Sequence, residues 1–524
     1  MIYTSPFPKI EIPITPLHEH LFEHADKWAE KPALIDGPTG RSFTYSELRN
    51  AITAVAAGLG SRGFKKGDVF AIFSPNIPEY AVAFFGVSTA GGVNTTINPL
   101  YTAEEVKRQL IDSTAAFLVT VPQFLPVALE AVQGTSVKEV FVFGEAEEAT
   151  PFSALLSVQQ EVDVAIDPCN DLVALPYSSG TTGLPKGVML THHNLVANLQ
   201  QTTAVEKIQP DDTLIGILPF YHIYGMTVIM GAALRSGATI VTMPRFDLEQ
   251  FLDLLQQHRV TVAYLVPPII LALAKHPLVD QYDISTLGNV MSGAAPLPES
   301  VAREAARRND MVVRQGYGLT ETSPVTHTNA RDTQLKIDSV GTALPNTEWR
   351  IIDVDSGLDA AEGDLGEVWI RGPQVMKGYL NNPQATVDMV DNDGWLHTGD
   401  IGKADADGYL YVVDRLKELI KYKGFQVAPA ELEAVIQSHP AVADAAVIPS
   451  PDTEAGEVPK AFVVLREKEN TNADELMTYV ASKVAPHKKI RRLEFIDAIP
   501  KVPSGKILRR ELVARERDNQ LKAK

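Results

Sequence analysis

The chain has 524 residues, a length typical of about two to four domains. Its apolar fraction of 45% and charged fraction of 21% exclude a disordered, collagen-like or coiled-coil protein as the main architecture. The net charge of −18 argues against a protein that coats nucleic acid. The single cysteine, Cys169, excludes a disulfide framework and a Cys-rich zinc module.

Charge is distributed unevenly along the chain. Residues 415–524 carry 20 basic and 16 acidic side chains, whereas residues 1–414 carry 27 and 49. This pattern indicates either a C-terminal segment that handles anionic ligands or a chance asymmetry of solvated faces. The N-terminus lacks a basic stretch followed by an apolar run, so we expect no signal peptide and a cytoplasmic protein. The longest apolar run, 214–234, contains Pro219, His222 and three glycines, which favours a buried strand and helix over a membrane span.

Short apolar strands alternate with amphipathic or apolar helices in the first half of the chain. Such alternation predicts an α/β fold with largely parallel sheets. The predicted helices cover 46–59, 78–90, 226–235 and 248–257. The predicted strands cover 69–74, 214–219, 238–243 and 260–266.

The pattern changes near Val340. Strands at 348–353 and 366–371 and a hairpin at 405–413 predict a β-rich subdomain over about 340–414. Beyond it, helices at 429–438 and 473–484 and strands at 443–448 and 460–465 predict an α+β unit. We therefore expect a large N-terminal domain, 1–414, and a small C-terminal domain, 415–524, joined by a hinge at about 414–417.

The segment Tyr177-Ser-Ser-Gly-Thr-Thr-Gly-Leu-Pro-Lys-Gly187 carries the strongest chemical signal. Its glycines allow backbone N–H groups to converge on an oxyanion, its hydroxyls add donors, and Lys186 adds a point charge. The G-x-x-x-x-G-K-[ST] spacing of a Walker A loop is absent. A phosphate-binding loop and a flexible Gly/Ser/Thr loop are the two interpretations of this segment on its own.

Three weaker motifs follow. In Gln315-Gly-Tyr-Gly-Leu-Thr-Glu-Thr322, Tyr317 offers a stacking face, and Thr320 and Glu321 offer oxygen ligands for Mg²⁺. In Gly394-Trp-Leu-His-Thr-Gly-Asp400, the carboxylate can accept two ribose hydroxyls or simply cap a turn. The basic run 414–424 and Pro503-Ser-Gly-Lys506 place cations at the predicted domain junction and in a turn near the C-terminus.

Taken in this order, the motifs resemble the adenylate-forming (ANL) superfamily of acyl-CoA synthetases, nonribosomal-peptide adenylation domains and firefly luciferase. The resemblance covers essentially the whole chain. Leu218-Pro-Phe-Tyr-His-Ile-Tyr224, Ser292-Gly-Ala-Ala-Pro-Leu297 and the stretch 413–433 are most similar to 4-coumarate–CoA ligases and luciferases. The resemblance implies an AMP-forming acid–thiol ligase that uses ATP, Mg²⁺ and coenzyme A and alternates between two domain arrangements.

The resemblance also implies a role for each motif residue. Lys506, Lys421, His222 and Glu321 are the expected catalytic residues, and Lys417 is the expected hinge. Thr182 and Glu321 are the expected Mg²⁺ ligands. The expected nucleotide and CoA contacts are Ser178, Ser179, Gly180, Thr181, Thr182, Gly183, Lys186, Ala295, Gly316, Tyr317, Gly318, Thr320, Asp400, Arg415, Lys423 and Gly424. Lys506 is expected to serve adenylate formation and Lys421 the thioester step, which requires the small domain to rotate.

The acyl site is expected, from the same resemblance, to contain Tyr224, Val228, Met291, Ala294, Pro324 and Val325 together with His222, Gly316 and Gly318. Glycines at 316 and 318 would open a flat slot suited to an aryl-propenoate, and Tyr224 could bind a para-hydroxyl. Val228 and the absence of Cys from Gly366-Glu-Val-Trp-Ile-Arg-Gly372 depart from the plant phenylpropanoid enzymes. The flat slot and Tyr224 favour a 4-coumarate-like hydroxycinnamate as substrate, whereas the two departures and the apolar lining leave a medium-chain fatty acid as the alternative.

Other function classes have less support. A serine hydrolase would carry G-x-S-x-G and a zinc enzyme H-E-x-x-H or paired cysteines, and none of these occurs. His20 and His24 have i,i+4 spacing but are expected on a surface helix. A luciferase-like oxidase of an acyl-adenylate and a nucleotide sensor remain open. We expect small-molecule partners, no nucleic acid, no stable membrane insertion, and a monomer or weak homodimer.

Overall fold

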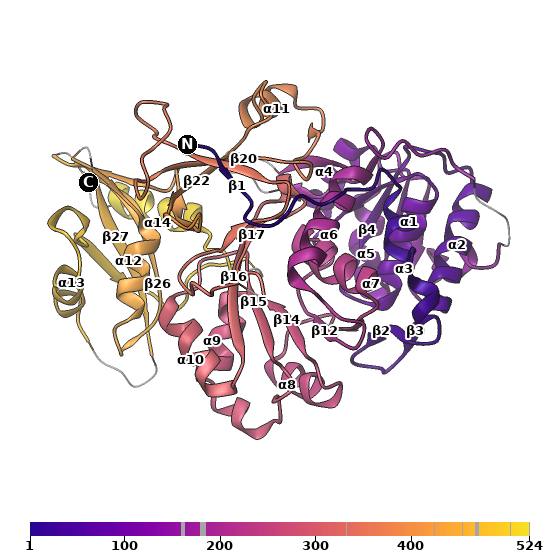
Figure 1. Ribbon diagram of the computed structural model, residues 1–524, viewed down its shortest axis with the longest axis horizontal. Helices are drawn as coiled ribbons and strands as arrows, with labels where there is room; N and C mark the ends of the chain where they lie inside the picture. Colours follow the sequence, from indigo (N-terminus) through magenta and orange to yellow (C-terminus); the bar gives the residue numbers. More distant parts are fainter. Residues whose placement is uncertain are drawn as a thin grey trace.

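Two large sheets, a smaller antiparallel sheet and a C-terminal sheet organise the computed structural model (Figure 1). It describes residues 1–158, 163–178, 185–331, 333–423, 425–452, 454–466, 471–502 and 505–522. Within these ranges the helices are α1 (Leu17–Phe22), α2 (Tyr45–Ser61), α3 (Pro78–Thr89), α4 (Ala103–Ser113), α5 (Leu125–Ala131), α6 (His192–Glu206), α7 (Ala232–Ser236), α8 (Leu248–Gln257), α9 (Pro267–Lys275), α10 (Glu299–Asn309), α11 (Pro383–Met389), α12 (Pro429–Gln437), α13 (Ala473–Ala481) and α14 (Arg509–Lys522).

The first sheet has the order β10-β11-β9-β5-β4-β6-β7-β8, with β21 paired to β11. Its strands are β4 (Val69–Phe73), β5 (Val93–Thr96), β6 (Phe117–Thr120), β7 (Glu139–Val142), β8 (Thr150–Pro151), β9 (Leu172–Ala174), β10 (Tyr177–Ser178), β11 (Lys186–Thr191) and β21 (Gly378–Tyr379). The central strand β4 is buried along its whole length, which explains its continuous apolar sequence.

The second sheet has the order β18-β17-β16-β15-β14-β12-β13-β2-β3, with parallel pairing from β2 to β16. Its strands are β2 (Pro32–Asp36), β3 (Ser42–Thr44), β12 (Thr213–Gly216), β13 (Thr239–Thr242), β14 (Val262–Leu265), β15 (Asn289–Ser292), β16 (Val312–Gly318), β17 (Val325–Thr328) and β18 (Thr342–Ala343). One continuous apolar core joins this sheet to the first one through α1, α3 and α6.

The third sheet is antiparallel, with the order β1-β19-β20-β22-β23. Its strands are β1 (Tyr3–Thr4), β19 (Glu348–Ile352), β20 (Gly366–Arg371), β22 (Leu396–Ala404) and β23 (Leu410–Arg415). The C-terminal sheet contains β24 (Ile420–Tyr422), β25 (Phe425–Val427), β26 (Val442–Asp452), β27 (Gly456–Leu465) and β28 (Arg492–Phe495). It has its own apolar core with α12 and α13 and lies at one end of the molecule (Figure 1).

The predicted fold class is confirmed: the chain is α/β with parallel sheets, a β-rich region and a C-terminal α+β unit. Most predicted elements occur within a few residues of their expected limits. The helix predicted at 226–235 differs, because a π-helical segment, Tyr224–Gly231, precedes the short α7. Gly225 makes this geometry possible, since a Cβ there would lie 2.2 Å from the Pro219 carbonyl oxygen. The surface location expected for His20 is wrong: His20 lies on α1 and is 2% exposed. In the part of the chain that the structure describes, no helix is long and apolar enough to cross a membrane.

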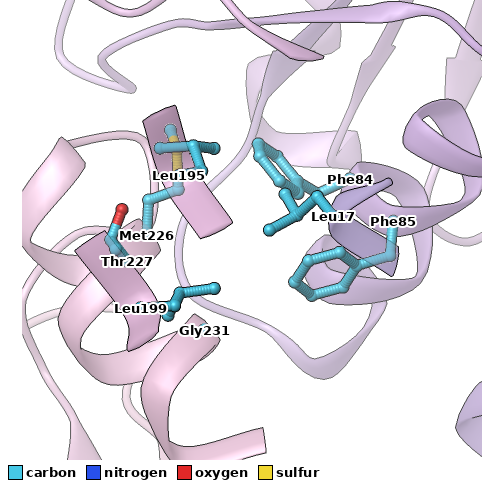
Figure 2. A pocket seen from close by; sticks show the side chains of 8 residues that line it. All are labelled: Leu17, Phe84, Phe85, Leu195, Leu199, Met226, Thr227 and Gly231. Carbon is cyan, nitrogen blue, oxygen red and sulfur yellow. The ribbon is translucent and has the colours of Figure 1, made fainter. Parts of the chain in front are cut away.

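A small apolar cavity lies between the π-helical segment, α1, α3 and α6 (Figure 2). Leu17, Phe84 and Phe85 line it from one side, and Met226 and Thr227 from the other. Thr227 is 3% exposed, and its hydroxyl has no hydrogen-bond partner among the described residues. The π-helical segment therefore buries an unsatisfied polar group on the face that points into this cavity.

Replacing Thr227 with valine is expected to stabilise the protein by about 1 kcal/mol, because it removes the desolvation penalty of an unpaired hydroxyl while keeping the β-branched shape. Thermal unfolding followed by circular dichroism measures the effect. Thr202→Val is a matched comparison on the adjacent α6, since its buried hydroxyl also lacks a partner in the described residues. A lower midpoint for Thr227→Val would contradict the interpretation.

Candidate active site

The predicted phosphate-binding loop connects two strands. Ser178, at the end of β10, pairs with Lys186 at the start of β11 in an antiparallel hairpin. The Lys186 ammonium lies 4.9 Å from the centre of the Tyr379 ring. The predicted contacts Ser179, Gly180, Thr181, Thr182 and Gly183 lie outside the described residues. The described ends of the hairpin therefore bring Ser178 and Lys186 to one end of the first sheet.

Glu321 lies directly beside this hairpin. It is 6% exposed, and its Oε1 accepts hydrogen bonds from Ser178 Oγ at 2.9 Å and from Tyr379 Oη at 2.8 Å. Among the described residues, no hydrogen bond is made to Oε2. A buried carboxylate with one oxygen open in this way fits the hard-oxygen ligand that Mg²⁺ prefers. The residues present are therefore compatible with the predicted role of Glu321, whereas Thr182 lies outside the described range.

Asp400 lies on β22, next to Arg415 on β23. Its Oδ2 accepts a hydrogen bond of 2.5 Å from Tyr317 Oη, and its Oδ1 lies 3.5 Å from Arg415 Nε. Burial raises the pKa of Asp400, while the charges of Arg415 and Lys506 and the Tyr317 hydrogen bond oppose the rise. The carboxylate thus lies in a polar site with Tyr317 and Arg415, where it could accept hydrogen bonds from two vicinal hydroxyls.

Lys506 belongs to the C-terminal segment but lies among residues of the preceding sheets. Burial, followed by repulsion from Arg415, lowers the pKa of Lys506 to about 8, and Glu418, Asp400 and Glu321 oppose this shift. The turn before Lys506 contacts α9, because a Cβ on Gly505 would lie 2.9 Å from Pro268. Lys506 therefore lies where the charges of Asp400 and Glu321 act on it, and the turn before it lies against α9.

His222 is a second titratable group on which the charge of Lys506 acts. Burial, with a smaller contribution from the charge of Lys506, lowers the pKa of His222 to about 4. The ring is therefore neutral near pH 7, and Nδ1 accepts a hydrogen bond of 3.2 Å from the Tyr224 backbone N–H. With Nδ1 occupied, the remaining ring nitrogen carries the proton and can act as a donor.

The predicted acyl residues differ in solvent exposure, from exposed positions at the surface to buried positions in the core. Ala294 and Gly318 are exposed, whereas Val228 and Met291 are 2% and 5% exposed. Tyr224 Oη donates to the Met291 carbonyl oxygen at 3.4 Å. The remaining members, Pro324 and Val325, follow Gly318 and lie at the start of β17.

Gly316 and Gly318 differ in what a side chain at each position would contact. A Cβ on Gly318 would lie 2.1 Å from the Pro324 carbonyl oxygen, so backbone packing alone excludes a side chain. A Cβ on Gly316 would lie 3.3 Å from the His327 carbonyl oxygen and 3.4 Å from Met291 Sδ. Gly316, but not Gly318, is therefore positioned to control space beside the acyl residues.

Several predicted residues are not brought to this site. Lys421 is exposed on β24, and its backbone N–H donates to Glu457. Lys423 is also exposed, and Gly424 lies outside the described residues. Lys417 is exposed in the turn after β23. Ala295 and Thr320 are partly exposed beside the Gly316–Gly318 strand end.

Two residues of the site were missed by sequence reasoning. Tyr379 donates to Glu321, and it follows Gly378, whose φ of +145° turns the chain at that point. Glu418 acts electrostatically on Lys506 and forms an ion pair of 3.2 Å with Arg509. Glu418 lies within the basic run 414–424, where it is one of the acidic residues, and that contrast was the available signal.

Comparisons with known proteins identify the family of the chain. Residues 21–380 match the family model described as AMP-binding enzyme, and residues 431–506 match the AMP-binding enzyme C-terminal domain. The chain is 45% identical over 528 residues to 4-coumarate–CoA ligase 1 of Solanum tuberosum, covering 98% of this chain and 96% of the relative.

Two solved structures show the same fold. Anthranilate CoA ligase AuaEII with anthranoyl-AMP has a TM-score of 0.89 at 26% identity, covering 97% of this chain and 99% of that one. ATP-bound MatB from Rhodopseudomonas palustris has a TM-score of 0.87 at 30% identity, covering 96% and 99%. The chain therefore belongs to the AMP-binding enzyme family of adenylate-forming proteins and is an AMP-forming acid–CoA ligase that uses ATP, Mg²⁺ and coenzyme A.

Proposed function

We propose that the protein activates a 4-coumarate-like hydroxycinnamate with ATP and transfers the acyl group to coenzyme A. The main support is the electrostatic interaction of Lys506 with Asp400, Glu321 and His222, which we propose bind the ribose, bind Mg²⁺ and orient the acyl group. The names of the curated relatives support the choice of acid. We further propose a cytoplasmic protein that is a monomer or weak homodimer.

The first half-reaction joins a carboxylate oxygen to the α-phosphorus of ATP and releases pyrophosphate. Two anions must approach each other, so positioning and charge stabilisation carry most of the catalysis. Lys506 is proposed to lie between the substrate carboxylate and the α-phosphate and to neutralise both. Bound Mg²⁺, held in part by Glu321, would supply further charge stabilisation on the phosphates. Asp400 and Arg415 are proposed to fix the ribose.

The second half-reaction forms a thioester. The thiol of coenzyme A loses its proton to solvent, and its sulfur attacks the acyl carbon. The bond from that carbon to the phosphate oxygen breaks, and AMP leaves with the electron pair. His222 is proposed to orient the acyl group through its protonated ring nitrogen. Lys421, which is exposed in this arrangement, is proposed to enter the site after rotation of the C-terminal domain.

A carboxylate panel tests the proposed substrate. Purified protein is incubated with ATP, Mg²⁺ and CoA against 4-coumarate, ferulate, cinnamate, benzoate, hexanoate, octanoate and palmitate, and AMP release and thioester mass are measured. Efficient turnover of the aryl acids with weak turnover of the aliphatic acids is the expected result. Faster turnover of octanoate would establish the fatty acyl alternative, which the buried apolar Val228 and Met291 favour. Oxygen consumption with the adenylate would instead indicate the oxidase alternative.

Replacing Asp400 with asparagine is expected to weaken ATP binding by about 10- to 100-fold, because a charged acceptor for two ribose hydroxyls is lost. Isothermal titration calorimetry of ATP measures the change. Asp407→Asn, in the exposed turn between β22 and β23, is the matched control. Equal ATP affinities for the two variants would remove Asp400 from the ribose site.

A further inference from the structure

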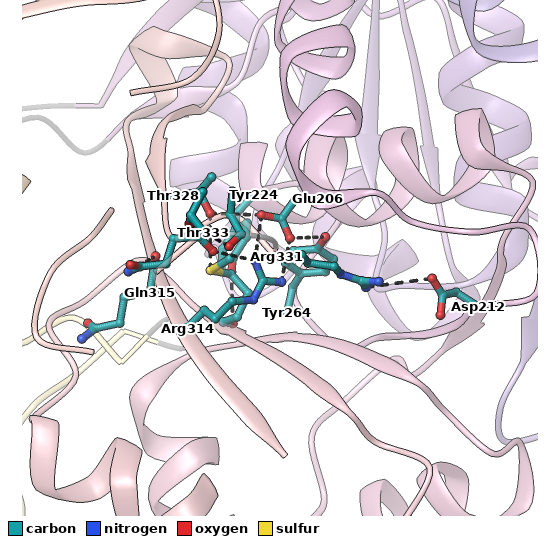
Figure 3. Close-up of polar contacts among 12 residues, drawn as sticks. Glu206, Asp212, Tyr224, Tyr264, Arg314, Gln315, Thr328, Arg331 and Thr333 are labelled. Carbon is teal, nitrogen blue, oxygen red and sulfur yellow. Dashed lines mark hydrogen bonds and ion pairs between the residues drawn. The ribbon is translucent and has the colours of Figure 1, made fainter. Parts of the chain in front are cut away.

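A buried ion pair lies at the core side of the acyl residues (Figure 3). Glu206, the last residue of α6, and Arg314, on β16, each have side chains only 3% exposed. Arg314 donates from Nη2 to Glu206 Oε2 at 2.9 Å and from Nη1 to Oε1 at 3.2 Å. This two-point geometry is the strong form of an arginine–carboxylate contact. No residue of this pair belongs to the sequence motifs described above.

Further donors hold the pair in place. Thr328 Oγ1 donates to Glu206 Oε1 at 3.0 Å, and Tyr264 Oη approaches Oε2 at 3.4 Å. Arg314 also donates from Nη1 to the Asn329 carbonyl oxygen at 2.7 Å. Replacing only one member of such a pair leaves an uncompensated buried charge, so the two residues stabilise the fold only as a pair.

Strand register places this unit next to the acyl residues. Tyr264 pairs with Met291 across β14 and β15, and Met291 pairs with Arg314 across β15 and β16, so the three side chains lie in one row on one face. Gly316 lies two residues beyond Arg314 on the same face and pairs with Thr328.

Side-chain contacts support the same placement. The Tyr224 and Tyr264 rings pack edge to face with centres 6.2 Å apart, and Thr328 Oγ1 lies 4.0 Å from Met291 Sδ. A Cβ on Gly316 would lie 3.8 Å from Thr328 Oγ1. Burial and the charge of Glu206 raise the pKa of Tyr224, which keeps the phenol protonated. Three acyl residues, Tyr224, Met291 and Gly316, thus adjoin the ion-pair cluster.

We propose that the Glu206–Arg314 pair is the buried end wall of the acyl site and selects acids with a short, hydroxylated far end over acids with a longer alkyl chain. This inference rests on the proposed function. Glu206 and Arg314 act as positioning residues, because they reach the substrate through Tyr224, Met291 and Thr328.

The ion-pair cluster is expected both to exclude longer alkyl chains and to favour a hydroxylated far end. A longer alkyl chain would have to displace Thr328 or Tyr264 and break hydrogen bonds of a buried carboxylate that it cannot replace. A para-hydroxyl finds a polar neighbour in Tyr224, whose described hydrogen bond to Met291 is long at 3.4 Å. A site that hydrogen-bonds a substrate hydroxyl discriminates against analogues that lack it far better than an apolar pocket discriminates by size.

The test replaces both charges at once. Glu206→Leu with Arg314→Met removes the pair but keeps apolar volume, a change that buried ion pairs often tolerate. A second variant, Thr328→Val, removes one donor to Glu206 in a nearly equal volume. Lys275→Met with Glu304→Leu removes a remote, partly exposed pair of 2.8 Å between α9 and α10 and is the matched control. KM and kcat are measured for 4-coumarate, cinnamate, hexanoate and octanoate by AMP release.

In the double variant, the kcat/KM ratio of 4-coumarate to cinnamate is expected to fall about 10-fold, and that of octanoate to hexanoate to rise by a similar factor, mainly through KM. The Thr328→Val ratios should move about threefold in the same directions, and the control ratios should stay constant.

Ratios that stay within about twofold of wild type in a folded double variant would overturn the end wall. If the double variant does not fold, unchanged ratios in Thr328→Val overturn it. If the wild-type protein turns over 4-coumarate but the variants leave these ratios constant, only the end-wall proposal is overturned. A wild-type protein that releases no AMP with any of the four acids overturns the proposed function itself, and the end wall with it.

Discussion

Replacing Lys506 with methionine is expected to slow acyl-adenylate formation by about 10²- to 10³-fold, the usual loss when one group that stabilises transition-state charge is removed. Lys506 is the cation that lies with Asp400, Glu321 and His222 in the arrangement described here. Methionine keeps the length of the side chain and removes the charge. Carboxylate-dependent exchange of pyrophosphate into ATP measures this half-reaction without CoA.

The pH dependence provides a second measure of the same role. Burial and Arg415 lower the pKa of Lys506 to about 8, so the required cation is fully present near pH 6.5 and is lost as the pH rises through about 8. The kcat/KM for the acid should therefore fall on the alkaline side of pH 8. His222, with a pKa lowered to about 4, does not change charge in that range. Lys506→Arg should move the alkaline limb to higher pH.

Lys483→Met is the control for the Lys506 variant. Lys483 belongs to the same C-terminal unit, is exposed, and lies 4.4 Å from the Tyr479 ring centre. Its loss should leave pyrophosphate exchange unchanged. Pyrophosphate exchange by Lys506→Met at a rate close to wild type would show that this lysine does not act on the reacting carboxylate and phosphate.

Local sequence patterns predicted the helices and strands whose formation depends on neighbouring residues in the chain. The helix α2 begins at Thr44 with a capping box to Glu47, and the buried strand β4 is a continuous apolar run. Asp400 and Lys506 follow glycine turns that recur in a known family, so the resemblance could name them before the fold was known. The electrostatic interaction between them links residues 106 positions apart, which no local pattern contains.

The parts that escaped prediction depend on long-range packing. Tyr379 reaches Glu321 only because β21 pairs with β11 beside the hairpin. Glu206 and Arg314 lie in no recognised motif, and only the fold brings the end of α6 and strand β16 together so that the two charges are buried as a pair. His20 was expected at the surface because of its polarity, whereas the turn of α1 directs it into the core.

Replacing Lys417 with proline is expected to retain adenylate formation and to slow thioester formation by about 10²-fold or more, because a fixed φ restricts the backbone change that a hinge must make. We propose that residues 415–524 rotate about this hinge as one domain. Lys421 is exposed in the present arrangement while Lys506 is inserted, so a second arrangement is needed to bring Lys421 into the site.

The local structure makes this substitution a selective one. Lys417 lies in the turn after β23, where Leu416 N–H bonds the Gly399 carbonyl oxygen and Glu418 N–H bonds that of Arg415. The Lys417 N–H makes no backbone hydrogen bond with the described residues, and its φ is not in the left-handed region. Proline at 417 therefore removes no described hydrogen bond of the present arrangement, although it also restricts the backbone of Leu416 within the 415–418 turn.

Single-turnover kinetics separate the two steps. Pyrophosphate exchange without CoA reports adenylate formation, and rapid mixing of CoA with the preformed enzyme-bound adenylate reports thioester formation. Lys417→Ala removes the same side chain without restricting φ, so it should keep both rates near wild type. Equal losses of both rates in Lys417→Pro would indicate general damage to the turn. A normal thioester rate would show that the backbone at residue 417 does not move, and the domain rotation would then need another hinge between Asp414 and Ile420.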